Sequence, residues 1–156
     1  MQSLYVERIQ KMFLPEPEDR DEGKWANELT VKTAFLTLLY NDIIFIMDSE
    51  KELERRYADL TMIVRPDKRH ASVYDVLIEF KYVSLKDAGI NGAQAEKLSE
   101  KELSEIPKIQ QELANGTKQV AEYGKKLEQR HKNLRLVKFA VAALGFERVC
   151  FTKVEG

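Results

Sequence analysis

Two apolar runs separated by a single polar turn constrain the fold of this chain more than any other feature of the sequence. Residues 57–64 (YADLTMIV) and 73–83 (VYDVLIEFKYV) both follow the two-residue period of a β-strand. Between them, residues 65–72 (RPDKRHAS) combine a proline, an aspartate and several charges, a composition typical of a turn. The sequence therefore predicts an antiparallel pair of strands.

The flanking segments predict further strands and helices around this pair. They are two helices over 24–40 and 108–131, and three more strands over 43–47, 137–144 and 148–154. The polar segment 84–107 is expected to be less regular, with short helical turns around 99–105. The order helix, three strands, helix, two strands is typical of an α/β or α+β domain with a mixed sheet flanked by helices.

The first 23 residues are predicted to stand apart from this domain. The apolar spacing indicates a short amphipathic helix over 2–13, and PEPEDRDEG (15–23) is an acidic linker, which leaves 24–156 as the domain. No run approaches the ~20 apolar residues that span a bilayer. The N-terminus carries charge early and has no signal-peptide apolar core. We therefore expect a cytoplasmic protein with no membrane partner.

Composition excludes several classes of site. The one cysteine, Cys150, cannot form an internal disulfide and lies in an apolar run, so we expect a small core residue. Two histidines and one cysteine do not favour zinc, whereas the plentiful carboxylates suit a hard cation. The formal net charge is −1, so any contact with phosphate must come from a local patch or from metal ions.

Three charged side chains, Asp59, Glu79 and Lys81, interrupt the two apolar strands. Glu79 and Lys81 share one face of a strand, while Phe80 points to the opposite face. If 65–72 closes the turn, Asp59 falls opposite Glu79 or the residue before it. Facing carboxylates repel each other unless a cation lies between them, so the register with Glu79 predicts a divalent metal site. An exposed Glu–Lys surface pair is the alternative.

Three residues in the predicted helices are additional candidates for the site. Glu28 lies in the first predicted helix of the domain, and Gln119 and Tyr123 are one turn apart on the long helix, so they share a face. Each is also compatible with an ordinary helix position that has no role in a site.

Taken in order, Glu28, YADL, IEFKY and QVAEY resemble the PD-(D/E)XK nuclease superfamily. In particular they are similar to the nuclease-like domain found C-terminal to AAA-type ATPase-like proteins. The resemblance runs from about Lys24 to Val154 and implies a restriction-endonuclease-like α-β-β-β-α-β core. It also implies Mg²⁺ dependence, with Mn²⁺ able to substitute, and hydrolysis of phosphodiester bonds. One departure is Ala58, which stands where the family usually has a proline.

The resemblance also assigns roles to residues. It makes Asp59 and Glu79 metal ligands, Lys81 the catalytic lysine and Glu28 the acid of the first helix, a further ligand. The backbone carbonyl of Phe80 adds another oxygen ligand. Gln119 and Tyr123 form an accessory helix motif.

The function expected from these features is a Mg²⁺-dependent nuclease acting on DNA. Two other readings are an RNA-directed nuclease and a catalytically silent module that binds nucleic acid or a partner AAA-type ATPase. No Walker-type phosphate loop occurs in the sequence, so such an ATPase would lie outside it. The basic residues that could follow phosphates are Arg55, Arg56 and Lys118, and less strongly Lys68, Arg69, Lys125 and Lys126.

Overall fold

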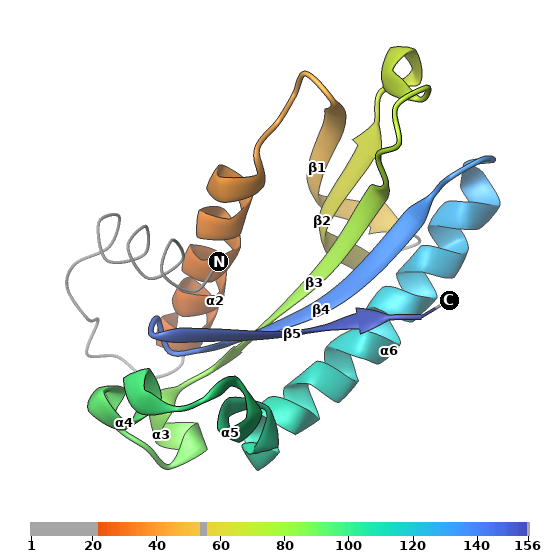
Figure 1. The fold of residues 1–156 in the computed structure, drawn as a ribbon. Helices are drawn as coiled ribbons and strands as arrows, with labels where there is room; N and C mark the ends of the chain where they lie inside the picture. Colours follow the sequence, from red (N-terminus) through yellow and green to blue (C-terminus); the bar gives the residue numbers. More distant parts are fainter. Residues whose placement is uncertain (1–21, 54–55, 156) are drawn as a thin grey trace.

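The central sheet has five strands in the order β1-β2-β3-β4-β5 and helices on both faces (Figure 1). The computed structural model describes residues 22–53 and 56–155. The strands are β1 (Phe45–Leu53), β2 (Arg56–Val64), β3 (Asp75–Val83), β4 (Leu136–Leu144) and β5 (Arg148–Val154). The helices are α2 (Glu22–Leu39), α3 (Leu85–Ala88), α4 (Gly92–Lys97), α5 (Glu100–Glu105) and α6 (Pro107–Arg130), with a 3-10 turn at Pro66–Lys68.

The sheet is mixed, as the sequence predicts. β2 runs antiparallel to both β1 and β3, β3 and β4 are parallel, and β5 returns antiparallel to β4. Two parallel neighbouring strands need a long crossover connection. Here α6, which lies between β3 and β4 in the chain, provides it by running back along one face of the sheet. The predicted α/β fold with an α-β-β-β-α-β core is therefore confirmed.

The register between β2 and β3 decides which charged residues meet. Leu60 pairs with Ile78 and Met62 with Val76. Asp59 precedes Leu60 and Glu79 follows Ile78, so the same register carried one step further sets Asp59 opposite Glu79. This is one of the two registers that the turn predicts.

The two faces of β3 bury different partners. Ile78, Phe80 and Tyr82 pack with residues of α2, where the Phe35 and Phe80 rings lie 4.9 Å apart. On the other face, Leu77 packs with Val120 and Tyr123 of α6. Each large apolar side chain buried in this way contributes about 1.5–3 kcal/mol. The sheet is therefore held from both sides, and β3 is fixed at its centre.

Two segments differ from the sequence prediction. The apolar run at 43–47 is predicted to continue into a polar tail that forms the strand end and turn. In the structure β1 begins at Phe45 and continues to Leu53, because the SEKEL segment pairs with β2 although most of its residues are charged. Charged residues are common in edge strands, which have a neighbour on one side only. The 84–107 segment forms three short helices, which is more regular than predicted, although the one at 100–105 confirms the helical turns predicted around 99–105. The helices at 92–97 and 100–105 each begin with a capping box.

The predicted helix over 2–13 and most of the linker over 15–23 lie outside the described residues. The division of the chain near residue 23 therefore stays a prediction. Within the described part, no helix has the length and apolar character needed to cross a bilayer. Cys150 packs against the apolar cluster around Leu144, as expected, and its burial raises the pKa of the thiol.

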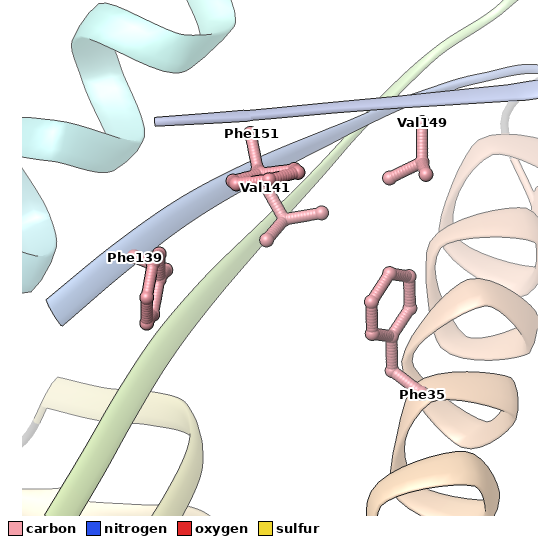
Figure 2. Close-up of a pocket in the computed structure, with 5 residues that line it drawn as sticks. All are labelled: Phe35, Phe139, Val141, Val149 and Phe151. Carbon is pink, nitrogen blue, oxygen red and sulfur yellow. The ribbon is translucent and has the colours of Figure 1, made fainter. Parts of the chain in front are cut away.

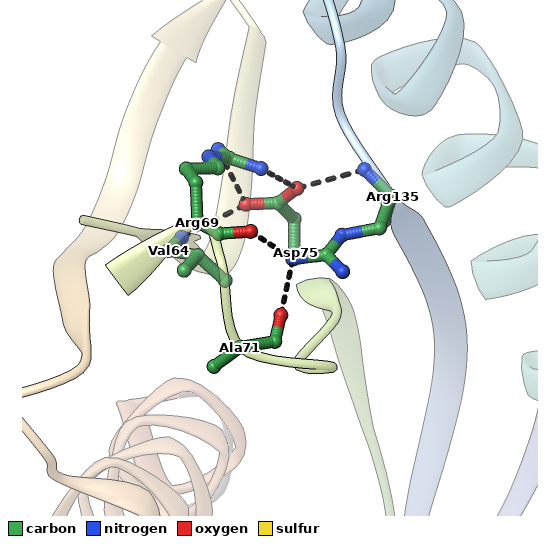
Figure 3. Close-up of polar contacts among 5 residues, drawn as sticks. All are labelled: Val64, Arg69, Ala71, Asp75 and Arg135. Carbon is green, nitrogen blue, oxygen red and sulfur yellow. Dashed lines mark hydrogen bonds and ion pairs between the residues drawn. The ribbon is translucent and has the colours of Figure 1, made fainter. Parts of the chain in front are cut away.

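A fully buried carboxylate, Asp75, lies at the start of β3 and connects this strand to the end of β2, the turn between them and the start of β4 (Figure 3). Its two oxygens accept hydrogen bonds from both terminal nitrogens of Arg69, at 2.7 and 2.8 Å, and from the backbone N–H groups of Val64 and Arg135. The guanidinium of Arg135 also donates to the backbone carbonyls of Arg69 and Ala71. This network fixes the turn between β2 and β3 to the start of β4.

An apolar hollow of about 160 Å³ lies between α2 and the strands β4 and β5 (Figure 2). Its lining consists of Phe35, Phe139, Val141, Val149 and Phe151. The side chains that line it carry no group able to polarise or attack a bond, so we do not place chemistry there.

Candidate active site

The site forms where β2 and β3 cease to pair by backbone hydrogen bonds. There the N–H of Phe80 donates to Oδ2 of Asp59 at 2.7 Å, so the carboxylate takes the place of a strand partner. In an antiparallel sheet the N–H and C=O of one residue point to the same neighbouring strand. The carbonyl of Phe80 therefore points to the β2 side of β3, and its role as a metal ligand stays a prediction.

Glu79 and Lys81 form an ion pair on the α6 face of β3. The Lys81 ammonium lies 2.9 Å from Oε1 of Glu79, and the two side chains are 17% and 6% exposed. The second oxygen of Glu79, Oε2, is buried and has no hydrogen-bond partner among the residues that the structure describes. A buried acceptor without a partner is unfavourable, so this position suits a donor or a cation that the protein itself does not supply.

The charges of the site shift the pKa values of both residues. Burial, followed by the charge of Asp59, raises the pKa of Glu79 to about 7, although Lys81 and Lys32 act in the opposite direction. Burial would lower the pKa of Lys81, but Glu79, Asp59 and Glu28 together raise it above its usual value. Lys81 is therefore an ammonium at neutral pH. A cation bound beside Glu79 would favour the ionised form of this carboxylate and oppose the effect of its burial.

Lys32, on α2, is a site residue that the sequence analysis missed. Its ammonium lies 2.7 Å from Oδ1 of Asp59, with the two side chains 13% and 15% exposed. α2 covers the opposite face of the sheet, and Lys32 reaches Asp59 where β2 and β3 separate. The available signal was a lysine between Leu29 and Leu36, in the apolar stripe of the predicted helix.

Glu28 lies one turn before Lys32 on α2 and is half-buried. Its charge is among those that act on Lys81, so the helix brings it near the site. Its role as a metal ligand stays a prediction.

α6 closes over the Glu79–Lys81 pair through a glycine. A Cβ added at Gly116 would lie 3.7 Å from Cγ of Lys81 and 3.8 Å from Cγ of Glu79, so the helix backbone packs directly on both side chains. Gln119 follows one turn later, and its Oε1 is buried without a hydrogen-bond partner in the described part of the chain. Tyr123 is buried against Leu77. The predicted helix motif therefore lies on the face of α6 that meets the sheet.

The basic residues named as candidate phosphate contacts lie in different environments. Arg69 is one of the weaker phosphate candidates, and its guanidinium pairs with the buried carboxylate of Asp75 through both terminal nitrogens. Lys68 pairs with its neighbour Asp67. Lys118 is exposed on α6 and stays a candidate. Arg55 lies outside the described residues and Arg56 lies in β2, so both stay predictions.

The residues present fit a hard cation with few protein ligands. In residues 22–53 and 56–155, no group of three or more His, Cys, Asp or Glu side chains is arranged to hold a metal. Asp59 and Glu79 provide two carboxylates, and Oε2 of Glu79 has no partner. Mg²⁺ binds to proteins through one or two carboxylates and keeps several waters, so two are sufficient.

Comparison with known proteins identifies the family of the chain. A family model described as the PD-(D/E)XK nuclease superfamily matches residues 26–153, most of the chain. Searches of curated proteins and of solved structures gave no significant match.

Proposed function

This chain belongs to the PD-(D/E)XK nuclease superfamily, and we propose that it is a Mg²⁺-dependent nuclease that hydrolyses phosphodiester bonds of DNA. The observation that carries the proposal is the buried Glu79, which is paired with Lys81 through one oxygen while the other has no partner. With Asp59 opposite, the chain presents two carboxylates beside the ammonium groups of Lys81 and Lys32. This combination suits metal-assisted hydrolysis of a phosphate ester.

Each residue has a defined part in this proposal. Asp59, Glu79 and the Phe80 carbonyl would hold Mg²⁺, with Glu28 as a further acid. When bound, the ion would polarise the scissile phosphate and lower the pKa of a coordinated water. The Lys81 ammonium would orient the attacking water and offset the negative charge that develops on the phosphate. Because it is protonated, we assign it this electrostatic role and not that of a base.

The helix residues would support these groups. Gln119 offers a hydrogen-bonding amide beside the Glu79–Lys81 pair, and Tyr123 packs behind Leu77. Lys118, Arg55 and Arg56 are proposed to contact the nucleic-acid backbone, which positions a substrate without reading its sequence. An AAA-type ATPase as partner, or as part of the same polypeptide, stays a prediction from the sequence resemblance.

Cleavage assays test the proposal. Supercoiled, linear and single-stranded DNA, and RNA, are incubated with Mg²⁺, with Mn²⁺ and with EDTA. We expect cleavage of DNA with either ion and none with EDTA. Cleavage of RNA alone would change the assigned substrate, and cleavage that persists in EDTA would overturn metal dependence.

The alternative is a module that binds nucleic acid or a partner ATPase without cleaving, and the formal net charge of −1 favours it. A protein that binds DNA in the presence of Mg²⁺ but leaves every substrate intact would support this alternative.

Metal binding should also stabilise the protein. A ligand that binds the native state alone stabilises it by about 2.7 kcal/mol at a concentration 100 times its Kd. Each kcal/mol raises the Tm of a domain of this size by roughly 2–4 °C. We therefore expect Mn²⁺ or Mg²⁺ to raise the Tm by several degrees, measured by differential scanning fluorimetry.

Asp59→Asn should largely remove this rise, because it deletes a ligand charge while keeping an acceptor for the Phe80 N–H. Asp48→Asn is the matched control, since Asp48 is an exposed aspartate on the neighbouring strand β1. An equal rise in the wild type and in Asp59→Asn would exclude Asp59 as a ligand.

A further inference from the structure

Lys32 occupies an unusual position for a lysine. It lies on α2, the helix that packs Val31, Ala34 and Phe35 into the core, and its side chain is 13% exposed. A buried ammonium is unfavourable unless it is paired. Here the pair is with Asp59, the carboxylate that β2 directs toward the proposed metal site. The helix therefore delivers a positive charge to the point where a cation is expected.

The two oxygens of Asp59 are held in different ways. Oδ2 accepts the Phe80 N–H, which is part of the backbone of a central strand and cannot withdraw. Oδ1 is held by the Lys32 ammonium, at the end of a flexible four-carbon chain. An incoming cation therefore gains access to Asp59 by displacing the lysine.

The same ammonium acts on the second carboxylate of the site. The β2–β3 register, carried one step beyond the Leu60–Ile78 pair, sets Glu79 opposite Asp59. The Lys32 ammonium, 2.7 Å from Oδ1 of Asp59, therefore lies beside both carboxylates that the proposed function assigns to the metal. In the absence of metal it offsets their mutual repulsion.

We propose that Lys32 is an internal counter-cation of the metal-free site, and that a divalent metal and the Lys32 ammonium compete for Oδ1 of Asp59. The identity of the competing ligand rests on the proposed function, but the pairing of Lys32 with Asp59 does not. On this basis Lys32 is a positioning residue that stabilises the empty site and sets its affinity for metal.

Isothermal titration calorimetry with Mn²⁺, without nucleic acid, tests the competition. Lys32→Gln should bind Mn²⁺ roughly tenfold more tightly or better, because a charge a few ångströms from the ion no longer opposes it. Lys32→Arg should bind Mn²⁺ more weakly than the wild type, because a guanidinium can hold the carboxylate through two hydrogen bonds. Unchanged or weaker binding by a folded Lys32→Gln protein would overturn the proposal, as would tighter binding by Lys32→Arg.

Lys108→Gln is the matched control. Lys108 pairs with Glu112 at 3.1 Å on α6, so the variant also removes one lysine from an ion pair. Its Mn²⁺ affinity should equal that of the wild type. A gain similar to that of Lys32→Gln would show an effect of net charge alone and would overturn the assignment to Lys32.

Thermal unfolding provides a readout that is independent of activity. Lys32→Gln should melt below the wild type without metal, because two carboxylates lose a counter-ion, and should show a larger Mn²⁺-induced rise in Tm. A purely structural role for Lys32 would lower the Tm without enlarging that rise, and would overturn the proposal.

These measurements separate the two proposals. A wild type that binds Mn²⁺ but cleaves no substrate would refute the nuclease and leave the competition standing. Cleavage that requires Mn²⁺, together with equal affinities in the wild type and Lys32→Gln, would refute the competition alone. Absence of Mn²⁺ binding in both proteins would refute the competition and the metal site together.

Discussion

Lys81→Ala is expected to lower the rate of phosphodiester cleavage by about 10²–10³-fold, the loss typical when one preorganised group that stabilises transition-state charge is removed. The Lys81 ammonium is held 2.9 Å from Glu79, so its position is set before substrate binds. The loss should fall mainly on kcat, because the charge it offsets develops in the transition state. Single-turnover cleavage assays with Mg²⁺ measure the loss of rate in Lys81→Ala, and circular dichroism shows whether the variant is folded.

A second lysine variant distinguishes this role from a general loss of positive charge. Lys101 is on α5 and its side chain is 83% exposed, so Lys101→Ala should cleave at the wild-type rate. If Lys81→Ala folds correctly and turns over as fast as the wild type, Lys81 has no catalytic role. If KM rises while kcat is unchanged, Lys81 contributes to binding alone.

The strand pair could be predicted from the sequence because the pattern and the turn reinforce each other. A shift of one residue would turn the apolar side chains of β3 to the wrong face. This constraint made the position of Asp59 relative to Glu79 predictable to within one residue. The two faces of β3 were also predictable, and Leu77 and Phe80 pack on opposite sides as expected.

The contribution of Lys32 could not be predicted in the same way. Its place in the stripe of α2 follows from the sequence, but the contact with Asp59 depends on how α2 crosses the sheet and where β2 separates from β3. These are tertiary features that no local period encodes. The pairing of Arg69 with the buried Asp75 is also a tertiary feature, because the charged turn does not show which of its basic residues reaches back to the start of β3.

Asp75→Asn is expected to destabilise the fold by about 3 kcal/mol, the lower end of the ~3–5 kcal/mol typical for breaking a buried ion pair. The lower end applies because Arg69 is 28% exposed and water can partly replace its partner. Asparagine retains one acceptor oxygen, but it cannot satisfy both nitrogens of Arg69 together with the N–H groups of Val64 and Arg135. Urea denaturation at neutral pH measures the loss.

Asp67→Asn is the matched control, since Asp67 belongs to the same turn but its side chain is 67% exposed beside Lys68. Exposed pairs of this kind contribute roughly 0–1 kcal/mol, so the control should unfold close to the wild type. In a double-mutant cycle, Asp75→Asn and Arg69→Met together should destabilise less than the sum of the two single changes, because both break the same contact. Strict additivity would mean that the two residues stabilise the fold independently.

The stability that Asp75 contributes should depend on pH, and the direction follows from its pKa. Burial alone would raise the pKa of Asp75, but the hydrogen bonds from Arg69, Val64 and Arg135 hold it below its usual value. The unfolded chain therefore binds the proton more readily than the native protein does. The contribution of Asp75 is present above the pKa of the unfolded state and is lost as the pH falls through the lower pKa of the folded state. Wild type and Asp75→Asn should thus differ most at neutral pH and converge in acid. A difference in unfolding free energy that stays constant from neutral pH into the acid range would show that Asp75 does not act through its charge.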